Sequence, residues 1–387
     1  MLSLYLHFPF CKRKCFYCDF CSAAAGQAEV AAYCSALEQE ISLMAAVYGH
    51  MPVDTVFLGG GTPSVVPASM LKQVLKTLRK HFELTGDVEF TSEANPGTLT
   101  EAWMDVLTGA GMNRLSLGVQ AMQPQLLATL GRVHDFPQAL DAIALAHRYG
   151  VHNVNADVMF ALPGQTRQAY LDTLEALANA GVTHLSAYSL ILESGTPLAT
   201  RVAQGEVVMP DEDAAADMLE AGIDLLKAKG YARYEISNFA QEGYACRHNL
   251  GYWQQKHYLG LGLSAASHLP AREPHAAYLR RQNTPSRTAY LQALSGGLLP
   301  PAEETPIGQK EAMFETVMLG LRTVQGVQFD HFQTLHGLAL PTVYAAAIER
   351  LKREGLLCDI DSAIPALALN RRGLAVQNTA MMAFMPD

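Results

Sequence analysis

The chain has 387 residues, of which 49% are hydrophobic and 17% charged, with a formal net charge of −9. This balance is typical of a soluble globular protein, and the length favours one large domain with a smaller one. The negative charge argues against nucleic acid as the main partner, because phosphate binding needs a basic surface. No apolar run approaches the ~20 residues that span a bilayer, and the N-terminus lacks the basic start of a signal peptide, so we expect a cytoplasmic protein.

Short β-rich runs alternate with helical patterns over the first part of the chain. We predict strands over Leu2–Phe8, Val53–Leu58, Val88–Thr91, Arg114–Leu117, Asn153–Met159 and His184–Ser189. We predict helices over Ala28–Val47, Ala68–His81, Leu99–Gly111, Phe136–Tyr149, Arg167–Ala180 and Asp211–Lys229. Six β/α units in series indicate a parallel sheet, either open or curved into a barrel.

Chemically distinctive residues follow most of these predicted strands. Cysteines come after the first strand, a glycine triplet (59–61) after the second, and Glu93 after the third. Gln120 follows the fourth strand, and Asp157 lies near the end of the fifth. The carboxyl ends of barrel strands converge on one mouth, whereas a doubly wound sheet gathers its ligand residues at one crevice. The pattern therefore favours an α/β fold with a partial (β/α)6 TIM-type barrel.

The regular alternation ends near Tyr231. Residues 231–269 are rich in aromatic residues, histidine and glycine, and residues 270–308 resemble loops with short helices. Helices are predicted over Glu311–Arg322, Phe329–His336 and Pro341–Glu354, followed by a β-like run over Ala366–Leu369. This pattern indicates a small α+β, winged-helix-like domain. Because the region has no basic stripe for DNA, we expect the domain to pack on the barrel or cover it rather than to bind DNA. We therefore predict a barrel over residues 1–235, a connecting region over 236–308 and a C-terminal domain over 309–387.

Four of the seven cysteines lie close together, at Cys11, Cys15, Cys18 and Cys21. A tight group in a large cytosolic protein points to a metal site rather than to disulfides. Thiolates are the preferred protein ligands of iron–sulfur clusters, and Cys11, Cys15 and Cys18 could each bind a different iron of a [4Fe–4S] cube. A zinc site, or a cluster with four protein ligands including Cys21, is the alternative, although zinc sites usually join two separated pairs.

The spacing Cys-x3-Cys-x2-Cys resembles the signature of the radical SAM superfamily. The resemblance implies that S-adenosylmethionine binds the iron without a protein ligand and is cleaved there by reduction. Tyr17 resembles the aromatic residue that packs against the adenine, although it could equally shield the cluster from water. Gly60, Gly61 and Thr62 resemble the motif that receives the amino end of S-adenosylmethionine; a tight βα turn is the simpler reading.

A more specific resemblance covers nearly the whole chain. The segments YLHFPFCKRKCFYCDF, VFLGGGTPS, SEANPG, LSLGVQ, NADVMFALPGQT and RYEISNFA occur here in the order seen in the family of oxygen-independent coproporphyrinogen oxidases and their haem-chaperone relatives. The resemblance implies contacts with S-adenosylmethionine at Tyr5, Glu93, Gln120, Arg132 and Asp157. Two positions depart from the family: Ala161 replaces a usual glycine, and Cys21 replaces the asparagine usual in the chaperones.

Three features favour the chaperone branch of that family. The chain begins almost at its first strand, without the extension of the oxidases, and Phe20 stands where the oxidases have a fourth cysteine. The segment RHNLGYW (247–253) also resembles the chaperones' HNxxYW motif. That motif implies haem contacts by His248, Tyr252 and Trp253, with an imidazole for the iron and flat apolar faces for the porphyrin. An aromatic core around a hydrogen-bonded histidine is the alternative.

We therefore expect a haem-binding chaperone that holds a [4Fe–4S] cluster and S-adenosylmethionine. Its expected partners are haem, haem-acceptor proteins and an electron donor. We do not expect coproporphyrinogen oxidase activity, although an oxidase and a radical SAM methyltransferase are the rival functions. Peripheral attachment to a membrane is also left open, since the acceptors of such a chaperone could be respiratory proteins.

Overall fold

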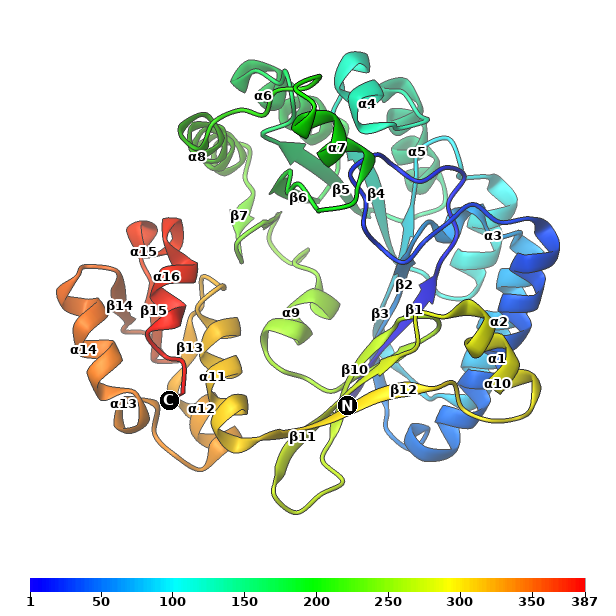
Figure 1. Ribbon diagram of the computed structural model, residues 1–387. Coiled ribbons are helices and arrows are strands. Elements are labelled where there is room, and N and C mark those ends of the chain that lie inside the picture. The colour runs from blue at the N-terminus through cyan, green and yellow to red at the C-terminus, as the bar shows by residue number, and fades with distance from the viewer. Residues whose placement is uncertain (387) are drawn as a thin grey trace.

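The computed structural model describes residues 1–386 (Figure 1). Its central strands, all parallel, are β1 (Leu2–Phe8), β2 (Val53–Gly60), β3 (Leu84–Ala94), β4 (Arg114–Gln120), β5 (Asn153–Phe160) and β6 (His184–Ser189). They belong to a 12-stranded sheet in the order β12-β11-β10-β9-β1-β2-β3-β4-β5-β6-β8-β7. The two ends of this order do not pair, so the sheet curves without closing. The predicted partial (β/α)6 barrel is therefore confirmed.

Helices surround the outside of the strand arc in Figure 1. They are α1 (Gln27–Tyr48), α2 (Ala68–His81), α3 (Glu101–Gly109), α4 (Pro124–Leu130), α5 (Phe136–Arg148), α6 (Arg167–Asn179), α7 (Pro197–Ala203) and α8 (Glu212–Ala228). Local signals set their starts; at α5, for example, the Asp135 side chain accepts the Gln138 N–H, and proline occupies the first turn. The six predicted helices are present. The short helices α4 and α7 were not predicted, because neither is long enough to show a clear helical period.

Additional strands extend the sheet at both ends. They are β7 (Ala232–Arg233) and β8 (Asn238–Ala240) beyond β6, and β9 (Tyr258–Leu261), β10 (Ala266–Pro270), β11 (Ala276–Asn283) and β12 (Ala302–Gly308) beyond β1. The expectation of loops with short helices over 270–308 was wrong, although a helix, α10 (Arg287–Ser295), does lie there. The strands were missed because their exposed face carries charged residues such as Arg280 and Glu304, which hide the apolar alternation.

A buried carboxylate ties this extension to the barrel. Glu40 on α1 is fully buried and accepts hydrogen bonds from the Gly262 N–H at 2.7 Å, Asn283 Nδ2 at 2.6 Å and the Tyr290 hydroxyl at 2.6 Å. Burial raises the pKa of Glu40 above its usual range. Three donors around one carboxylate offset part of the cost of removing it from water. This network fixes the loop after β9 and strand β11 against α1.

The inner face of the barrel is polar, which is unusual for this architecture. Side chains alternate along each strand, so Leu115 and Leu117 of β4 face the helices while Arg114 and Ser116 face inward. Thr55, Glu89, Asn155 and His184 are further polar residues on this inner face, and Phe57 is an aromatic one. In an ordinary β/α barrel, bulky aliphatic side chains fill this space. A polar interior costs stability, and its presence indicates that the interior serves binding or chemistry.

Helix α9 (Arg247–Trp253) lies inside the arc of strands, across its open side (Figure 1). Its first two N–H groups, those of Arg247 and His248, donate to the two oxygens of the Glu89 carboxylate, each at 2.9 Å. Glu89 lies on β3, so this pairing joins α9 to the inner wall of the barrel. An anionic group at a helix N-terminus meets unpaired N–H donors and the positive end of the helix dipole. The pairing therefore defines where α9 sits.

The C-terminal part has a hydrophobic core of its own, formed by residues that include Val317, Leu321, Phe332, Leu351 and Phe384. Its elements are α11 (Gln309–Gly320), β13 (Val327–Gln328), α12 (Phe329–His336), α13 (Leu340–Val343), α14 (Ala345–Arg353), β14 (Leu357–Ile360), β15 (Ala366–Leu369), α15 (Arg371–Ala375) and α16 (Gln377–Met382). Strands β13, β15 and β14 form a small antiparallel sheet. This agrees with the predicted α+β character, except that the single helix expected over Pro341–Glu354 is broken at Tyr344. The predicted boundaries at residues 235 and 308 stay predictions.

Within residues 1–386, no helix combines the length and the apolar character needed to cross a bilayer.

Candidate functional site

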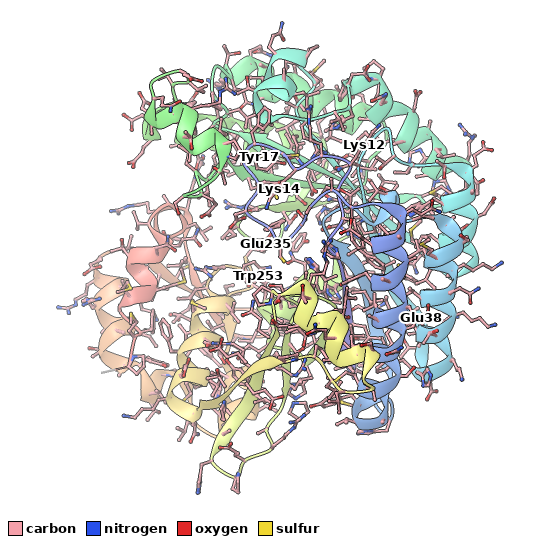
Figure 2. All side chains as sticks on the ribbon, turned by 45° about the vertical axis from the view of Figure 1, so that its right-hand side comes forward. Lys12, Lys14, Tyr17, Glu38, Glu235 and Trp253 are labelled. Atoms are coloured by element: carbon pink, nitrogen blue, oxygen red, sulfur yellow. The ribbon has the colours of Figure 1, made fainter. Side chains whose placement is uncertain are left out.

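The loop between β1 and α1 carries the cysteines over the mouth of the barrel. Cys11, Cys15 and Cys18 are half-buried free thiols that line one cavity of about 300 Å³. Figure 2 shows Lys14 and Tyr17 on this same loop. Across residues 1–386, no three His, Cys, Asp or Glu side chains lie close enough to hold one metal ion. Three thiols on one short loop that face a common cavity can each bind a different iron of a cluster.

The cysteine loop is held against α4 by specific contacts. The Phe16 N–H donates to the Leu130 carbonyl at 3.0 Å, and Arg13 Nη2 donates to the Gly131 carbonyl at 2.7 Å. Gly131 ends α4 at φ 73°, and a Cβ there would lie 2.9 Å from the Phe16 ring. Any larger residue would therefore push the loop away from α4. The loop conformation depends on this glycine as well as on its own sequence.

Two side chains donate to cysteine sulfurs. Arg132 Nη1 lies 3.4 Å from Cys15 Sγ, and the Thr62 hydroxyl lies 3.7 Å from Cys11 Sγ. Burial raises the pKa of the Cys18 thiol and so favours its protonated form, and a bound metal would have to displace that proton. Donors to sulfur favour the thiolate, the form that binds iron. The chemistry of this donor set therefore fits an iron–sulfur cluster on the loop.

Two glycines of the triplet are required by close packing, Gly60 against a side chain and Gly61 against backbone. Gly60 has φ 105°, and a Cβ on it would meet the His7 ring at 2.4 Å. A Cβ on Gly61 would meet the Phe10 carbonyl at 2.5 Å, while the Gly61 N–H donates to the Phe8 carbonyl. Both glycines line the mouth cavity, as does Thr62. They bring strand β2 against the cysteine loop and leave room for a ligand above it.

Carboxyl groups lie at the base of the mouth cavity. Glu93 accepts the Gly60 N–H at 3.2 Å, and burial, followed by the nearby Asp157, raises the pKa of Glu93 to about 8. Burial also raises the pKa of Asp157, which accepts a hydrogen bond from Asn155 Nδ2 at 2.8 Å. Glu93 is therefore mostly neutral at pH 7 in the absence of a ligand. Two carboxyl groups with raised pKa values in one cavity are typical of a binding or catalytic site.

Gln120 and Arg132 complete the wall. Gln120 has φ 72°, an unusual conformation for a residue other than glycine, and its Oε1 accepts the Tyr188 hydroxyl at 3.2 Å. Arg132 donates to Asn95 Oδ1 at 2.5 Å and to the Gly118 carbonyl. Tyr17 lies in the same cavity, where burial raises the pKa of its phenol. The sequence-predicted residues Tyr17, Glu93, Gln120, Arg132 and Asp157 thus meet around one space.

A second cavity, of about 280 Å³, lies deeper in the barrel and is called the inner cavity below. It shares Glu93, Ser116 and Asp157 with the mouth cavity, so the two adjoin. Tyr5 lines the inner cavity, not the mouth cavity, and its hydroxyl lies 3.1 Å from His7 Nδ1. Tyr5 shares the inner cavity with Glu93 and Asp157, so the structure separates it from Tyr17, Gln120 and Arg132, which line only the mouth cavity.

Helix α9 forms one wall of the inner cavity through His248, Asn249 and Tyr252. His248 is only 2% exposed, and it stacks on Phe57 with a ring-centroid distance of 5.1 Å. Its Nδ1 lies 2.7 Å from the Thr55 hydroxyl and its Nε2 lies 2.9 Å from the Tyr252 hydroxyl. Burial lowers the pKa of His248 to about 3, so the ring is neutral. Both ring nitrogens are occupied in this conformation.

Trp253 points away from these two residues. It lines a third cavity, of about 280 Å³, between α9 and the C-terminal domain, together with Lys256, Thr316 and His331. Figure 2 shows Trp253 between the barrel and the C-terminal helices. The indole Nε1 is buried and has no hydrogen-bond partner among the described residues. The aromatic residues of the RHNLGYW segment therefore serve two cavities on opposite sides of α9.

Several residues of the two cavities were missed from the sequence. These are Asn95, Arg114, Asn155, His184, Tyr188 and Tyr234. One signal was available: polar residues recur at every second position of predicted strands, as in Arg114-x-Ser116 and Asn155-x-Asp157. A parallel strand is normally apolar on both faces. Polar alternation in such strands marks a barrel interior that binds something.

A curved, open β/α barrel with three cysteines after its first strand defines a radical SAM protein. Residues 5–177 match the family model described as the radical SAM superfamily, and residues 307–376 match the HemN C-terminal domain. The chain is 36% identical to "Heme chaperone HemW" of Mycobacterium tuberculosis, over 96% of this chain and 91% of that one. It is 32% identical to the Bacillus subtilis protein of the same name over 100% of both chains. The chain belongs to the HemW family.

A solved structure shares the whole fold. The Escherichia coli coproporphyrinogen III oxidase HemN, described as a radical SAM enzyme, superposes with a TM-score of 0.83 at 23% identity. The match covers 99% of this chain and 89% of that one. At this identity, the likeness establishes the common architecture of barrel and C-terminal domain.

Proposed function

We propose that this protein is a haem chaperone that carries a [4Fe–4S] cluster and binds S-adenosylmethionine. The observation that carries the proposal is similarity over the full chain to proteins named haem chaperones. Two features of the site support it: three thiols share one cavity at the barrel mouth, and α9 presents the RHNLGYW segment to two cavities on its opposite sides. Haem and haem-acceptor proteins are the proposed partners, together with an electron donor, and the cytoplasm is the proposed location.

In this proposal Cys11, Cys15 and Cys18 hold the cluster, which supplies the electron for reductive chemistry on S-adenosylmethionine. Gly60, Gly61, Thr62, Gln120, Arg132 and Asp157 form the cavity that receives S-adenosylmethionine, with Tyr17 beside its adenine. Glu93 accepts a hydrogen bond from its amino group or ribose. Arg132 has a further positioning role, because it joins the cysteine loop to Asn95 and Gly118. Tyr5 contributes from the inner cavity below.

His248, Tyr252 and Trp253 are the proposed haem contacts. Ligation of iron by His248 would require its ring to leave either Thr55 or Tyr252, since both nitrogens are bonded. Trp253 needs no such change, because it lines the cavity beside the C-terminal domain. The proposal thus includes a rearrangement at His248 when haem binds through its iron.

The experiment that tests this function is a haem titration followed by absorbance, on protein reconstituted with its cluster under anaerobic conditions. Coproporphyrinogen turnover is assayed on the same sample. We expect stoichiometric haem binding and no decarboxylated product, and weaker binding by His248→Ala. Steady formation of protoporphyrinogen would make the protein an oxidase and overturn the proposal. Unchanged haem affinity of His248→Ala would remove that residue from the haem site.

The raised pKa of Glu93 predicts a pH-dependent affinity for S-adenosylmethionine. Glu93 must lose a proton to accept hydrogen bonds with both oxygens, so below about pH 8 binding has to expel that proton. The affinity of the wild-type protein for S-adenosylmethionine, divided by that of Glu93→Gln, should therefore increase as the pH is raised. The increase should be up to about tenfold per pH unit and should level off above about pH 8. Equilibrium dialysis across this range measures the ratio. A ratio that does not change with pH would mean that Glu93 does not change protonation on binding.

A further inference from the structure

Arg114 is a buried cation without a direct partner. It begins β4, is 2% exposed, and its guanidinium lines the inner cavity. Its Nε is buried and unbonded, and no ion pair or hydrogen bond connects its side chain to any other described residue. Other buried charges here are bonded; Arg281, for instance, is 3% exposed and contacts Asn283 and Glu304. A buried charge normally needs a hydrogen-bonded counter-group. Arg114 has no such group among the described residues.

The carboxyl groups near Arg114 are engaged elsewhere. Glu89 accepts the two N–H groups at the start of α9, and Asp157 accepts Asn155 Nδ2. Glu93 accepts the Gly60 N–H, and burial raises its pKa to about 8, which makes it mostly neutral at pH 7. Glu89 and Asp157 favour the positive charge of Arg114 from a distance, but neither occupies its donors. The guanidinium fork is left to face the cavity.

The rest of the inner cavity is suited to a polar group. Ser116, Asn155, Ser186 and Tyr234 line it, and the buried Oδ1 of Asn238 also has no partner. Opposite these strands stand His248, Asn249 and Tyr252 of α9. The planar fork of arginine matches a carboxylate in two parallel hydrogen bonds. A carboxylate in this space would meet Arg114 and the Ser116 hydroxyl, whose oxygen accepts Asn155 Nδ2 and whose own proton has no acceptor among the described residues.

We propose that the inner cavity is a carboxylate subsite in which Arg114 binds one carboxylate side chain of the haem contacted by α9. This inference rests on the proposed haem-chaperone function and adds to it the part of the ligand that enters the barrel. Haem carries its two carboxylates on flexible arms at one edge of the ring. An arm is narrow enough to enter a space that the ring does not, so α9 can stay in place while the arm reaches Arg114.

The test compares haem with haem dimethyl ester, in which both carboxylates are masked, in the same mild detergent. Wild-type protein should bind haem about ten- to hundredfold more tightly than the ester, as expected for hydrogen bonds to a charged group. Arg114→Gln should bind both at the weaker affinity, and Arg114→Lys should lie between, since it keeps the charge without the fork. Arg281→Gln, which removes another buried arginine outside the barrel, should keep the wild-type preference for haem.

The possible outcomes separate this inference from the proposed function. If wild-type protein binds haem and its ester equally, the subsite is wrong while the chaperone function stands. If it binds neither, the function itself fails. If Arg114→Gln keeps the preference for haem over its ester, other residues bind the haem carboxylates. If Arg114→Gln instead weakens the binding of S-adenosylmethionine, Arg114 serves that ligand. Both results overturn the proposal. Should Arg114→Gln fail to fold, the Arg114→Lys variant and the wild-type comparison still decide.

Discussion

Replacing Cys15 with alanine is expected to leave the protein without an iron–sulfur cluster after anaerobic reconstitution. Two remaining thiolates cannot hold a cube that needs three, and the Arg132 donor at 3.4 Å would lose its sulfur acceptor. Cys11→Ala and Cys18→Ala should behave in the same way. Iron and sulfide content, with the broad visible absorbance of the cluster, measures the loss. Far-UV circular dichroism should be unchanged, because the loop lies outside the barrel core.

The matched control for these variants is Cys21→Ala. Cys21 lies in the same loop, and its backbone carbonyl, not its thiol, lies 3.0 Å from His7 Nε2. Removing the thiol therefore leaves that contact in place, and the cluster content should stay at the wild-type level. If Cys21→Ala also lost the cluster, the four-cysteine alternative would be correct, and no iron would be open to S-adenosylmethionine. If Cys15→Ala kept a full cluster, the proposed ligand set would be wrong.

Glu89→Ala is expected to lower the free energy of unfolding by about 3 kcal/mol. The substitution leaves the N–H groups of Arg247 and His248 buried without an acceptor and removes a negative charge near the unpaired Arg114. Because Trp253 ends α9, its fluorescence reports on this helix during urea unfolding. The measurement is made in a Trp103→Phe background, in which Trp253 is the remaining tryptophan. Cluster content should be unaffected, since Glu89 does not line the mouth cavity.

A control for Glu89→Ala lies two residues earlier on the same strand. Asp87 also pairs with Arg247, at 3.4 Å, but its side chain is 78% exposed. An exposed ion pair contributes little, so Asp87→Ala should change the unfolding free energy by less than about 1 kcal/mol. Equal effects of the two substitutions would show that the buried carboxylate is not what holds α9 in the barrel.

The barrel could be predicted from the sequence because each parallel strand is a short apolar run followed by a long amphipathic helix. The mouth could be predicted because cysteine and glycine residues stand at strand ends, where a barrel gathers them. Glu93, Gln120 and Asp157 could be singled out in the same way, and the family resemblance added Arg132, which the structure brings to the same cavity. These features depend on local pattern or on motif order, both of which a single sequence contains.

The inner cavity could not be predicted in this way. Arg114 begins β4 and Glu89 lies in the middle of β3, in stretches where no motif draws attention to them, and their meeting with α9 depends on contacts between distant segments. The opposite directions of Tyr252 and Trp253 also follow from packing, because only the C-terminal domain gives Trp253 a surface to face. From their adjacent positions in the sequence, Tyr252 and Trp253 were expected to face one porphyrin, whereas in the structure they line two different cavities.

One departure from the family pattern has a clear structural meaning. Ala161, where glycine is usual, has φ 56°, in the left-handed region that side chains disfavour. The residue follows β5 at the barrel mouth and is 5% exposed. An alanine there adds backbone strain of about 1 kcal/mol that a glycine would not have. The buried Gln165 side chain holds the turn on both sides of Ala161, because it accepts the Leu162 N–H and donates to the Met159 carbonyl, each at 3.1 Å.

The attachment of α9 also has a consequence for the order in which the protein forms. The hydrogen bonds that place the helix join residues separated by 193 positions for Thr55 and His248, and by 158 and 159 positions for Glu89. Contacts across so much chain carry a high loop-closure cost and form late, while strands β1 to β6 join neighbours in sequence. During synthesis the barrel strands emerge first. A growing chain therefore has its cysteine loop and curved sheet well before α9 can dock, and the wall shared with Arg114 is among the last parts to be completed.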